Sequence, residues 1–186
     1  MTLKTKIQHT CNTTGGKKKV LKNAPFLAVD DIPKKKFQFL GEGYYFWDDN
    51  VEMANIWGKF HCNDKYYVVE MDLEFSSNDC FDIVGNRQHQ KLIFKTFDEL
   101  RKRGYDKKEW QLSNILNLLK KLSKKDKNAF PYSMIRAIDY MPRKEYNKLK
   151  LHFVQNNNHY TIVNPKMVIC ILNKNILPLH SKRLVS

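Results

Sequence analysis

The window of residues 40–58 constrains the fold of this chain more than any other segment. It reads LGEGYYFWDDNVEMANIWG, so two glycines precede four consecutive aromatic residues. Gly41 and Gly43 allow backbone paths and close approaches that a side chain would prevent. The aromatic residues 44–47 predict a short strand, and alternate side chains of a strand face opposite sides. A tight turn followed by a strand is therefore expected here.

Polar residues after the aromatic run mark the start of a helix. Asp49 or Asn50 can cap it, and Glu52 lies near the reciprocal position of a capping box. Small and apolar residues then follow at helical spacing. We predict a helix over residues 49–60, directly after the strand.

The rest of the chain alternates between strand and helix patterns. Strands are predicted over residues 6–11, 65–75, 149–153, 160–163 and 167–172, with a short apolar segment over 133–140. Helices are predicted over residues 86–103 and 107–125, each from an apolar stripe. Alternation in residues 65–75 predicts a strand with one buried face. This order indicates a single α+β domain with a split antiparallel sheet, and 186 residues suffice for it.

The chain is strongly basic, with a formal net charge of +14 from 33 Lys and Arg against 19 Asp and Glu. Such a charge favours contact with nucleic acid or another polyanion, although a lysine-rich surface can also serve only to solvate the protein. Six of the cations are arginines, which gives little sign of bidentate recognition of bases or phosphates. Both interpretations of the charge stay open.

The cysteines indicate a reducing compartment. They are Cys11, Cys62, Cys80 and Cys170, and their spacing suggests no disulfide framework. His61 and Cys62 could be combined with Cys80 and His89, but this spacing matches no standard zinc site. The first ten residues have no apolar signal core, and no stretch is long enough to span a membrane. We therefore expect a cytoplasmic protein without a metal.

The window of residues 40–58 resembles a known one. NAD-dependent ADP-ribosyltransferases of the diphtheria-toxin and poly(ADP-ribose) polymerase type carry G-x-G-(I/V/F)-Y-F, then a helix with S-x-A or S-A-N. Here G-E-G-Y-Y-F spans residues 41–46 and M-A-N spans residues 53–55, without a gap. The resemblance implies an ADP-ribosyltransferase-like domain over residues 1–186, with a lysine-rich helical insertion at 86–127.

The first strand of this family carries a histidine that holds the ribose of NAD, and His9 stands at that place in Q-H-T-C. The glycine that commonly follows, whose backbone binds the amide of nicotinamide, is replaced by Thr10. The resemblance thus assigns His9, Thr10 and Gly43 to the binding of NAD. Considered alone, His9 would instead be a strand histidine whose hydrogen bonds are satisfied within the protein.

The second motif residue of the family is a tyrosine, which corresponds to Tyr45 and would stack on nicotinamide. In the polymerase branch a second tyrosine on the helix closes the other side of the ring. The ungapped register puts Ile56 at that position, with Trp57 beside it. Trp57 either turns toward the site and completes the sandwich or anchors the core.

The third motif residue is usually a glutamate. The polymerase branch reads E-Y-I-V-Y-N-P-x-Q-I, and this chain reads H-Y-T-I-V-N-P-K-M-V from His159. A carboxylate stabilises the oxocarbenium-like state of the glycosidic cleavage, whereas a protonated imidazole would repel it. If the register slips, Gln155, Asn158 or Lys166 would take the position. Polymer synthesis is therefore not expected, and the implied catalytic set is His9, Tyr45 and His159.

The resemblance implies a mono-ADP-ribosyltransferase that uses NAD as a co-substrate. The basic surface makes RNA or DNA a reasonable acceptor, and a protein acceptor is equally permitted. A toxin or phage-defence effector would fit, with a cognate antitoxin or inhibitor as a partner. Two alternatives stay open: a non-catalytic module that binds nucleic acid or another polyanion on the same fold, and simple hydrolysis of NAD.

Overall fold

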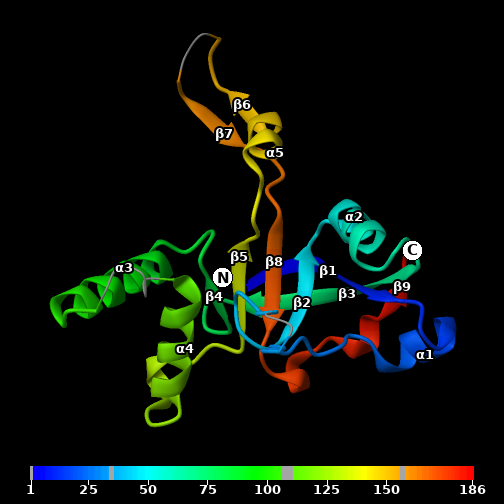
Figure 1. Ribbon diagram of the computed structural model, residues 1–186, viewed down its shortest axis with the longest axis horizontal. Coiled ribbons are helices and arrows are strands. Elements are labelled where there is room, and N and C mark those ends of the chain that lie inside the picture. Colours follow the sequence, from blue (N-terminus) through cyan, green and yellow to red (C-terminus); the bar gives the residue numbers. More distant parts are fainter. Residues whose placement is uncertain (1, 34–35, 106–110, 156–157) are drawn as a thin grey trace.

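The structure is a computed structural model that describes residues 2–33, 36–105, 111–155 and 158–186. The fold is α+β, as the sequence predicts, and its main sheet has the strand order β4-β5-β8-β2-β1-β3-β9 (Figure 1). These strands are β1 (Thr2–Asn12), β2 (Tyr44–Asp48), β3 (Tyr66–Ser76), β4 (Cys80–Asp82), β5 (Met134–Ile138), β8 (Met167–Ile171) and β9 (Arg183–Leu184). The helices are α1 (Gly16–Asn23), α2 (Val51–His61), α3 (Arg87–Lys102), α4 (Leu112–Ser123) and α5 (Arg143–Lys148). Short 3-10 turns cover Lys127–Ala129, Lys174–Ile176 and Leu179–Ser181.

The sheet is mixed and has a short central junction. β4 and β5 are parallel, whereas the other neighbouring strands pair antiparallel. β1 pairs with β3 along its whole length, but with β2 only at Ile7–Asp48 and Gln8–Trp47. Figure 1 shows β5, β8 and β2 aligned side by side, with β1 and β3 lying across them. The two halves therefore form one hydrogen-bonded sheet and diverge where β1 leaves β2.

A separate hydrophobic core packs against each face of the sheet. One core joins Ile7, Phe46 and Met71 to residues from α1 and the C-terminal segment. The other joins sheet residues such as Ile135 to Ile115 of α4 and to other residues of the helical segment. The helices of the predicted insertion at 86–127 thus share a core with the sheet.

The 40–58 window adopts the predicted turn, strand and helix. Of the two capping candidates, Asn50 caps α2, since its side chain accepts a hydrogen bond from the backbone N–H of Met53 at 2.9 Å. The prediction of one buried face for β3 was wrong in its first half. Val68 and Glu70, on the face opposite to the predicted buried one, are also buried because α2 and β9 cover this end of the strand.

The lysine-rich helices agree with the predicted ones where they are described. Asn86 caps α3 through its side chain, and Gly104, with a φ of 78°, follows the end of this helix. Residues 107–110 of the second predicted helix lie outside the described residues, and α4 begins at Leu112. No described helix is long and apolar enough to cross a membrane.

The segment between β5 and β8 leaves the sheet as an arm, which we define as residues 139–166. It contains α5 and a separate two-stranded sheet of β6 (Lys150–His152) and β7 (Tyr160–Ile162). The turn predicted at 155–158 falls between these strands, and its residues 156–157 lie outside the described part. Figure 1 shows the arm standing away from the main sheet.

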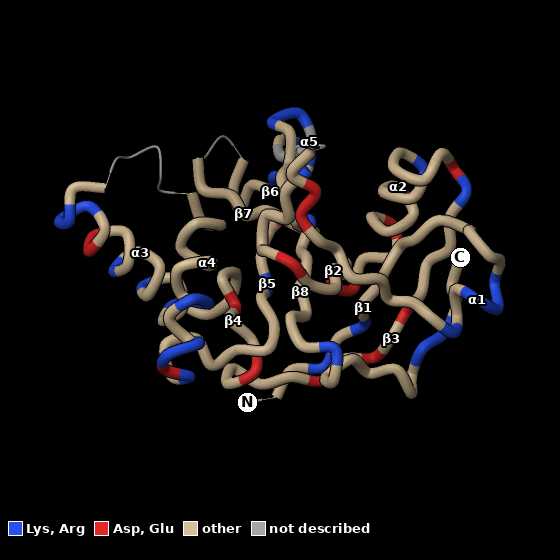
Figure 2. Tube along the Cα trace, turned by 60° about the horizontal axis from the view of Figure 1, so that its bottom comes forward, with Lys and Arg blue, Asp and Glu red and all other residues tan. Residues whose placement is uncertain are grey.

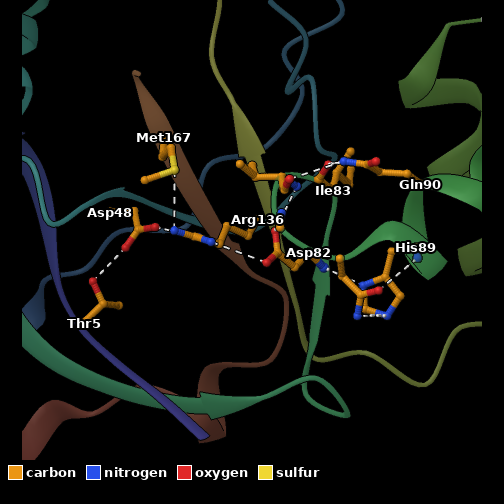
Figure 3. A network of polar contacts seen from close by, with 11 residues as sticks. Thr5, Asp48, Asp82, Ile83, His89, Gln90, Arg136 and Met167 are labelled. Carbon is orange, nitrogen blue, oxygen red and sulfur yellow. Dashed lines mark hydrogen bonds and ion pairs between the residues drawn. The ribbon is translucent and has the colours of Figure 1, made fainter. Parts of the chain in front are cut away.

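A buried ion network crosses the main sheet (Figure 3). Arg136 of β5 donates from Nε to Asp48 of β2 at 2.6 Å and from Nη1 to Asp82 of β4 at 3.4 Å. Its Nη2 contacts the Sδ of Met167 on the intervening strand β8 at 3.4 Å. Asp48 also accepts a hydrogen bond from Thr5 of β1 at 2.7 Å. The guanidinium therefore links β5 to β2, β4 and β8, and the bond between Asp48 and Thr5 extends the network to β1 in the other half of the sheet.

Candidate functional site

A pocket of about 250 Å³ lies where β1 and β2 diverge. Its lining comes from β1, β2 and α2, from the loop residues 26–28 and 36–39, and from the two ends of the arm: Gln8, His9, Thr10, Phe26, Ala28, Lys36, Gln38, Phe39, Tyr45, Phe46, Trp47, Trp57, Asp139 and Val168. The structure thus brings His9, Thr10, Tyr45 and Trp57 of the predicted site together. Gly43, Ile56 and His159 are not among the lining residues that are described.

His9 is buried between two backbone groups. Its Nδ1 lies 3.0 Å from the carbonyl oxygen of Tyr45, and its Nε2 accepts from the N–H of Phe26 at 3.2 Å. Because Nε2 is the acceptor, Nδ1 carries the proton and donates to Tyr45. Burial lowers the pKa of His9 below its ordinary 6.5, against the opposing effect of the bond to Tyr45. The imidazole is therefore neutral at pH 7. Its two hydrogen bonds connect the loop residues 26–28, which we call the covering loop, to the sheet.

Tyr45 closes the turn that precedes its own strand. Its hydroxyl donates to the carbonyl of Gly41 at 2.8 Å and accepts from the N–H of Leu40 at 3.0 Å. Burial raises the pKa of this phenol, so it stays protonated. The ring, which also contacts Phe39 at a centroid distance of 5.7 Å, lines the pocket. Tyr45 therefore offers an aromatic surface, while its hydroxyl holds the loop.

The backbone of Thr10 points toward the pocket. On the opposite strand, the N–H of Val68 donates to Ser186 at 2.8 Å and its carbonyl accepts from Val185 at 3.0 Å. Thr10 and Val68 therefore form a non-hydrogen-bonded pair of the β1–β3 ladder. The N–H and C=O of Thr10 must then point to the side of β2, just beyond the last pair at Gln8. Its side chain points to α2 and donates to the carbonyl of Ala54 at 2.8 Å.

Trp57 borders the pocket from α2. The indole is stacked on His61 of the same helix at a centroid distance of 4.6 Å, and 37% of the residue is exposed. Trp57 is thus a partly exposed wall rather than a core anchor. Ile56, the neighbouring residue that the resemblance assigns to NAD, is half-buried and lies outside the described lining.

Gly43 has a packing reason to be glycine. A Cβ at this position would lie 2.5 Å from Sγ of Cys170 and 2.9 Å from the carbonyl oxygen of Ile171. Gly43 also forms an isolated bridge with Ala28, which ties the covering loop to the start of β2. The second glycine of the window therefore lets the chain approach β8 closely.

A second hollow of about 570 Å³ continues the pocket along β1. The two hollows share His9, Thr10, Phe26, Ala28, Lys36 and Trp57. The second one extends past Cys11 to Thr14 and Lys19 at the start of α1, and to His61 and Cys62 at the end of α2. Together they form a groove that begins at an aromatic end and passes two lysines.

The arm carries the residues that the sequence aligns with the family's glutamate. His159 is exposed and precedes β7, and its carbonyl accepts from the N–H of Phe153. Gln155 and Asn158 lie in the same turn region, and Lys166 lies at the base of the arm. None of the four is among the described lining residues of the groove. The structure therefore does not bring His159 together with His9 and Tyr45.

The carboxylate that does line the pocket is Asp139, which the sequence interpretation missed. This half-buried residue follows β5, and its N–H donates to the carbonyl of Lys166 at 2.7 Å. One of its carboxylate oxygens accepts from the N–H of Tyr140 at 2.7 Å. The available signal was an acid at the end of the apolar segment 133–140, but only the sheet order brings that strand end to the pocket.

The four cysteines are free thiols. Burial raises the pKa of Cys11 to about 11, so this thiol in the groove is not a thiolate at neutral pH. Within the described ranges, no group of three His, Cys, Asp or Glu side chains could hold a metal ion. Comparisons of the chain with protein-family models, curated proteins and solved structures found no match.

Proposed function

We propose that the groove binds NAD and that the protein transfers a single ADP-ribose to a macromolecule. The observation that carries this proposal is the convergence of His9, Tyr45, Trp57 and the backbone of Thr10 on one pocket. Two aromatic side chains and a backbone N–H and C=O pair suit a flat ring with a carboxamide, which is the chemistry of nicotinamide. The 250 Å³ of the first hollow suits that end of the dinucleotide, and the second hollow offers room for the remainder.

The contacts of His9 define what binding requires. A ribose hydroxyl can donate to Nε2 only if it replaces the N–H of Phe26, which now occupies that nitrogen. NAD would therefore displace the loop residues 26–28, while the bond from Nδ1 to Tyr45 keeps the ring in place. Lys19 and Lys36 would meet the pyrophosphate farther along the groove.

Asp139 takes the role of the carboxylate in this proposal. As the bond between nicotinamide and ribose breaks, its electron pair leaves with the nicotinamide nitrogen, which becomes neutral. Positive charge develops on the ribose, and a nearby carboxylate stabilises it. The acceptor nucleophile then bonds to the anomeric carbon and releases its proton to solvent. His159, on the arm outside the pocket, has no part in this step.

Asp139→Asn is the sharpest test because the amide oxygen can still accept from Tyr140. We expect transfer of label from radioactive NAD to fall by roughly 100-fold, the usual effect of losing one electrostatic contact to a transition state. The rise in melting temperature with NAD should persist in this variant and disappear in Trp57→Ala. Glu52→Gln, an exposed acid on α2, is the matched control and should leave both unchanged. Absence of both NAD protection and nicotinamide release in the wild type would refute the proposal.

A specific observation favours a second candidate, a binding module without catalysis. Both nitrogens of His9 and the hydroxyl of Tyr45 are already bonded to backbone groups, so each has a structural reason to be present. Such a module would bind polyanions with a steep salt dependence and would release no nicotinamide. Nicotinamide released above the buffer background would count against it.

A further inference from the structure

The arm is rooted at the pocket and extends away from it. β5 and β8 pair from Met134–Ile171 to Ile138–Met167, and the bond from the N–H of Asp139 to Lys166 continues this pairing. Asp139 and Val168, on the two sides of this base, both line the pocket. A macromolecule that reaches the base of the arm would therefore lie next to the pocket.

The arm is basic, and its aromatic side chains are exposed. Residues 139–166 contain five Lys or Arg and two acids, and Figure 2 shows basic residues gathered near α5. Tyr140 is 78% exposed and Phe153 is 71% exposed. Lys150 lies over the ring of Tyr160 at 4.3 Å from its centroid. Cations beside exposed rings are what single-stranded nucleic acids bind, since phosphates meet the cations and unpaired bases stack on the rings.

We propose that the arm binds single-stranded RNA or DNA. Tyr140 and Phe153 stack on unpaired bases, and Arg143, Lys144 and Lys148 contact the phosphates. Binding depends only on the arm. That the bound strand is the acceptor of ADP-ribose rests on the function proposed above. Because Asp139 at the base of the arm lines the pocket, a nucleotide of that strand at the base would then lie near the reacting carbon.

The polar tip of the arm argues against insertion into a membrane. The described residues between β6 and β7 include Gln155 and Asn158, which are polar and exposed, so this end of the arm is polar. The exposed apolar residues Leu151, Phe153 and Val154 lie behind this tip, interleaved with Lys150 and His152. Apolar side chains that anchor a protein in lipid have to lie at the part of the protein that enters the membrane first.

Direct binding tests the arm without NAD. The probe is a fluorescent single-stranded oligonucleotide of about 20 nucleotides, longer than typical sites of 4–16. Tyr140→Ser with Phe153→Ser should weaken binding roughly tenfold or more and leave the salt dependence unchanged. Lys144→Glu with Lys148→Glu should also weaken binding and should lower the slope of log K against log salt.

Matched controls keep the test specific to the arm. Lys17→Glu with Lys18→Glu on α1 changes the net charge equally, at two exposed lysines, and should have a smaller effect. Replacing residues 140–165 by Asn-Gly closes β5 and β8 into a hairpin. This variant should lose the arm-dependent binding and keep the circular dichroism spectrum of a folded protein. Equal affinity of the arm variants and the wild type would overturn the proposal. So would equal binding of a duplex, or arm-dependent binding to anionic vesicles in place of the oligonucleotide. If binding depends on the arm but no label reaches the oligonucleotide, only the transferase proposal fails.

Discussion

His9 makes stability depend on pH near neutrality. Burial lowers its pKa, so the folded protein holds the neutral ring while the unfolded chain takes up a proton below pH 6.5. The unfolded state then binds more protons, and stability falls as pH drops from 6.5 toward the lower pKa of the folded state. His89, whose pKa burial also lowers, adds to this effect. We expect urea unfolding at pH 7.5, 6.5 and 5.5 to show a loss of at most about 1.4 kcal/mol per pH unit for each histidine.

The variant His9→Gln measures how much of the pH dependence of the free energy of unfolding comes from His9 in the pocket. Glutamine offers a donor and an acceptor but does not titrate, so the variant should lose part of the slope below pH 6.5. The exposed His180→Gln serves as the control and should keep the wild-type slope. The carboxyl groups of Asp72 and Asp79, whose pKa values hydrogen bonds lower, contribute only below their ordinary 3.8, outside this range. Parallel pH profiles of His9→Gln and the wild type would contradict the assignment.

At this scale the sequence located residues but not their contacts. His9 and Tyr45 were identified as a pair, and they do line one pocket. That the imidazole donates to the carbonyl of Tyr45 and accepts from Phe26 depends on a loop path that no periodicity encodes. Asp139 escaped notice because its strand joins the pocket only through β8, a pairing between segments far apart in sequence.

The helix α4 supports the glycine turn from outside the window. Lys120 donates from Nζ to the carbonyl of the buried Leu40 at 2.8 Å, and burial lowers the pKa of this ammonium. Lys120→Met leaves that carbonyl without this donor, so we expect a loss of about 1–3 kcal/mol in the free energy of unfolding. Lys121→Met removes the same charge from an exposed neighbour and should change stability by less than about 0.5 kcal/mol. Equal losses in urea titrations would show that charge, not this bond, is responsible.

At the scale of elements, local patterns sufficed where an element is long or capped. The strand after the glycines follows from its aromatic run, α2 from its capping side chains and helical spacing, and α3 from its apolar stripe. β4 was missed because a strand of three residues is too short to show an alternating pattern. Its partner β5 also lies more than 50 residues later in the sequence. The strands predicted over 149–153 and 160–163 exist, but they pair with each other instead of joining the main sheet. Pairing partners depend on tertiary packing, which the pattern within one strand does not specify.

At the scale of the whole molecule, the Arg136 network should hold the halves of the sheet together (Figure 3). It links β5 to β4 and β2, and through Asp48 to Thr5 of β1. Arg136→Met leaves two buried carboxylates without their cation, so we expect a loss of about 3–5 kcal/mol by urea unfolding, in one transition. Asp48→Asn and Asp82→Asn, added to that variant, should recover part of the loss because the uncompensated charges disappear.

Arg101→Met is the comparison for this prediction. Arg101 pairs with Asp98 on the surface of α3, where both side chains are more than half exposed. Water screens that pair, so its removal should lower the free energy of unfolding by less than about 1 kcal/mol. A loss in Arg136→Met as small as in Arg101→Met, or no recovery with the asparagine pair, would mean that backbone pairing alone joins the halves. The pocket where β1 and β2 diverge would then depend on the two-residue junction at Ile7 and Gln8, not on the Arg136 network.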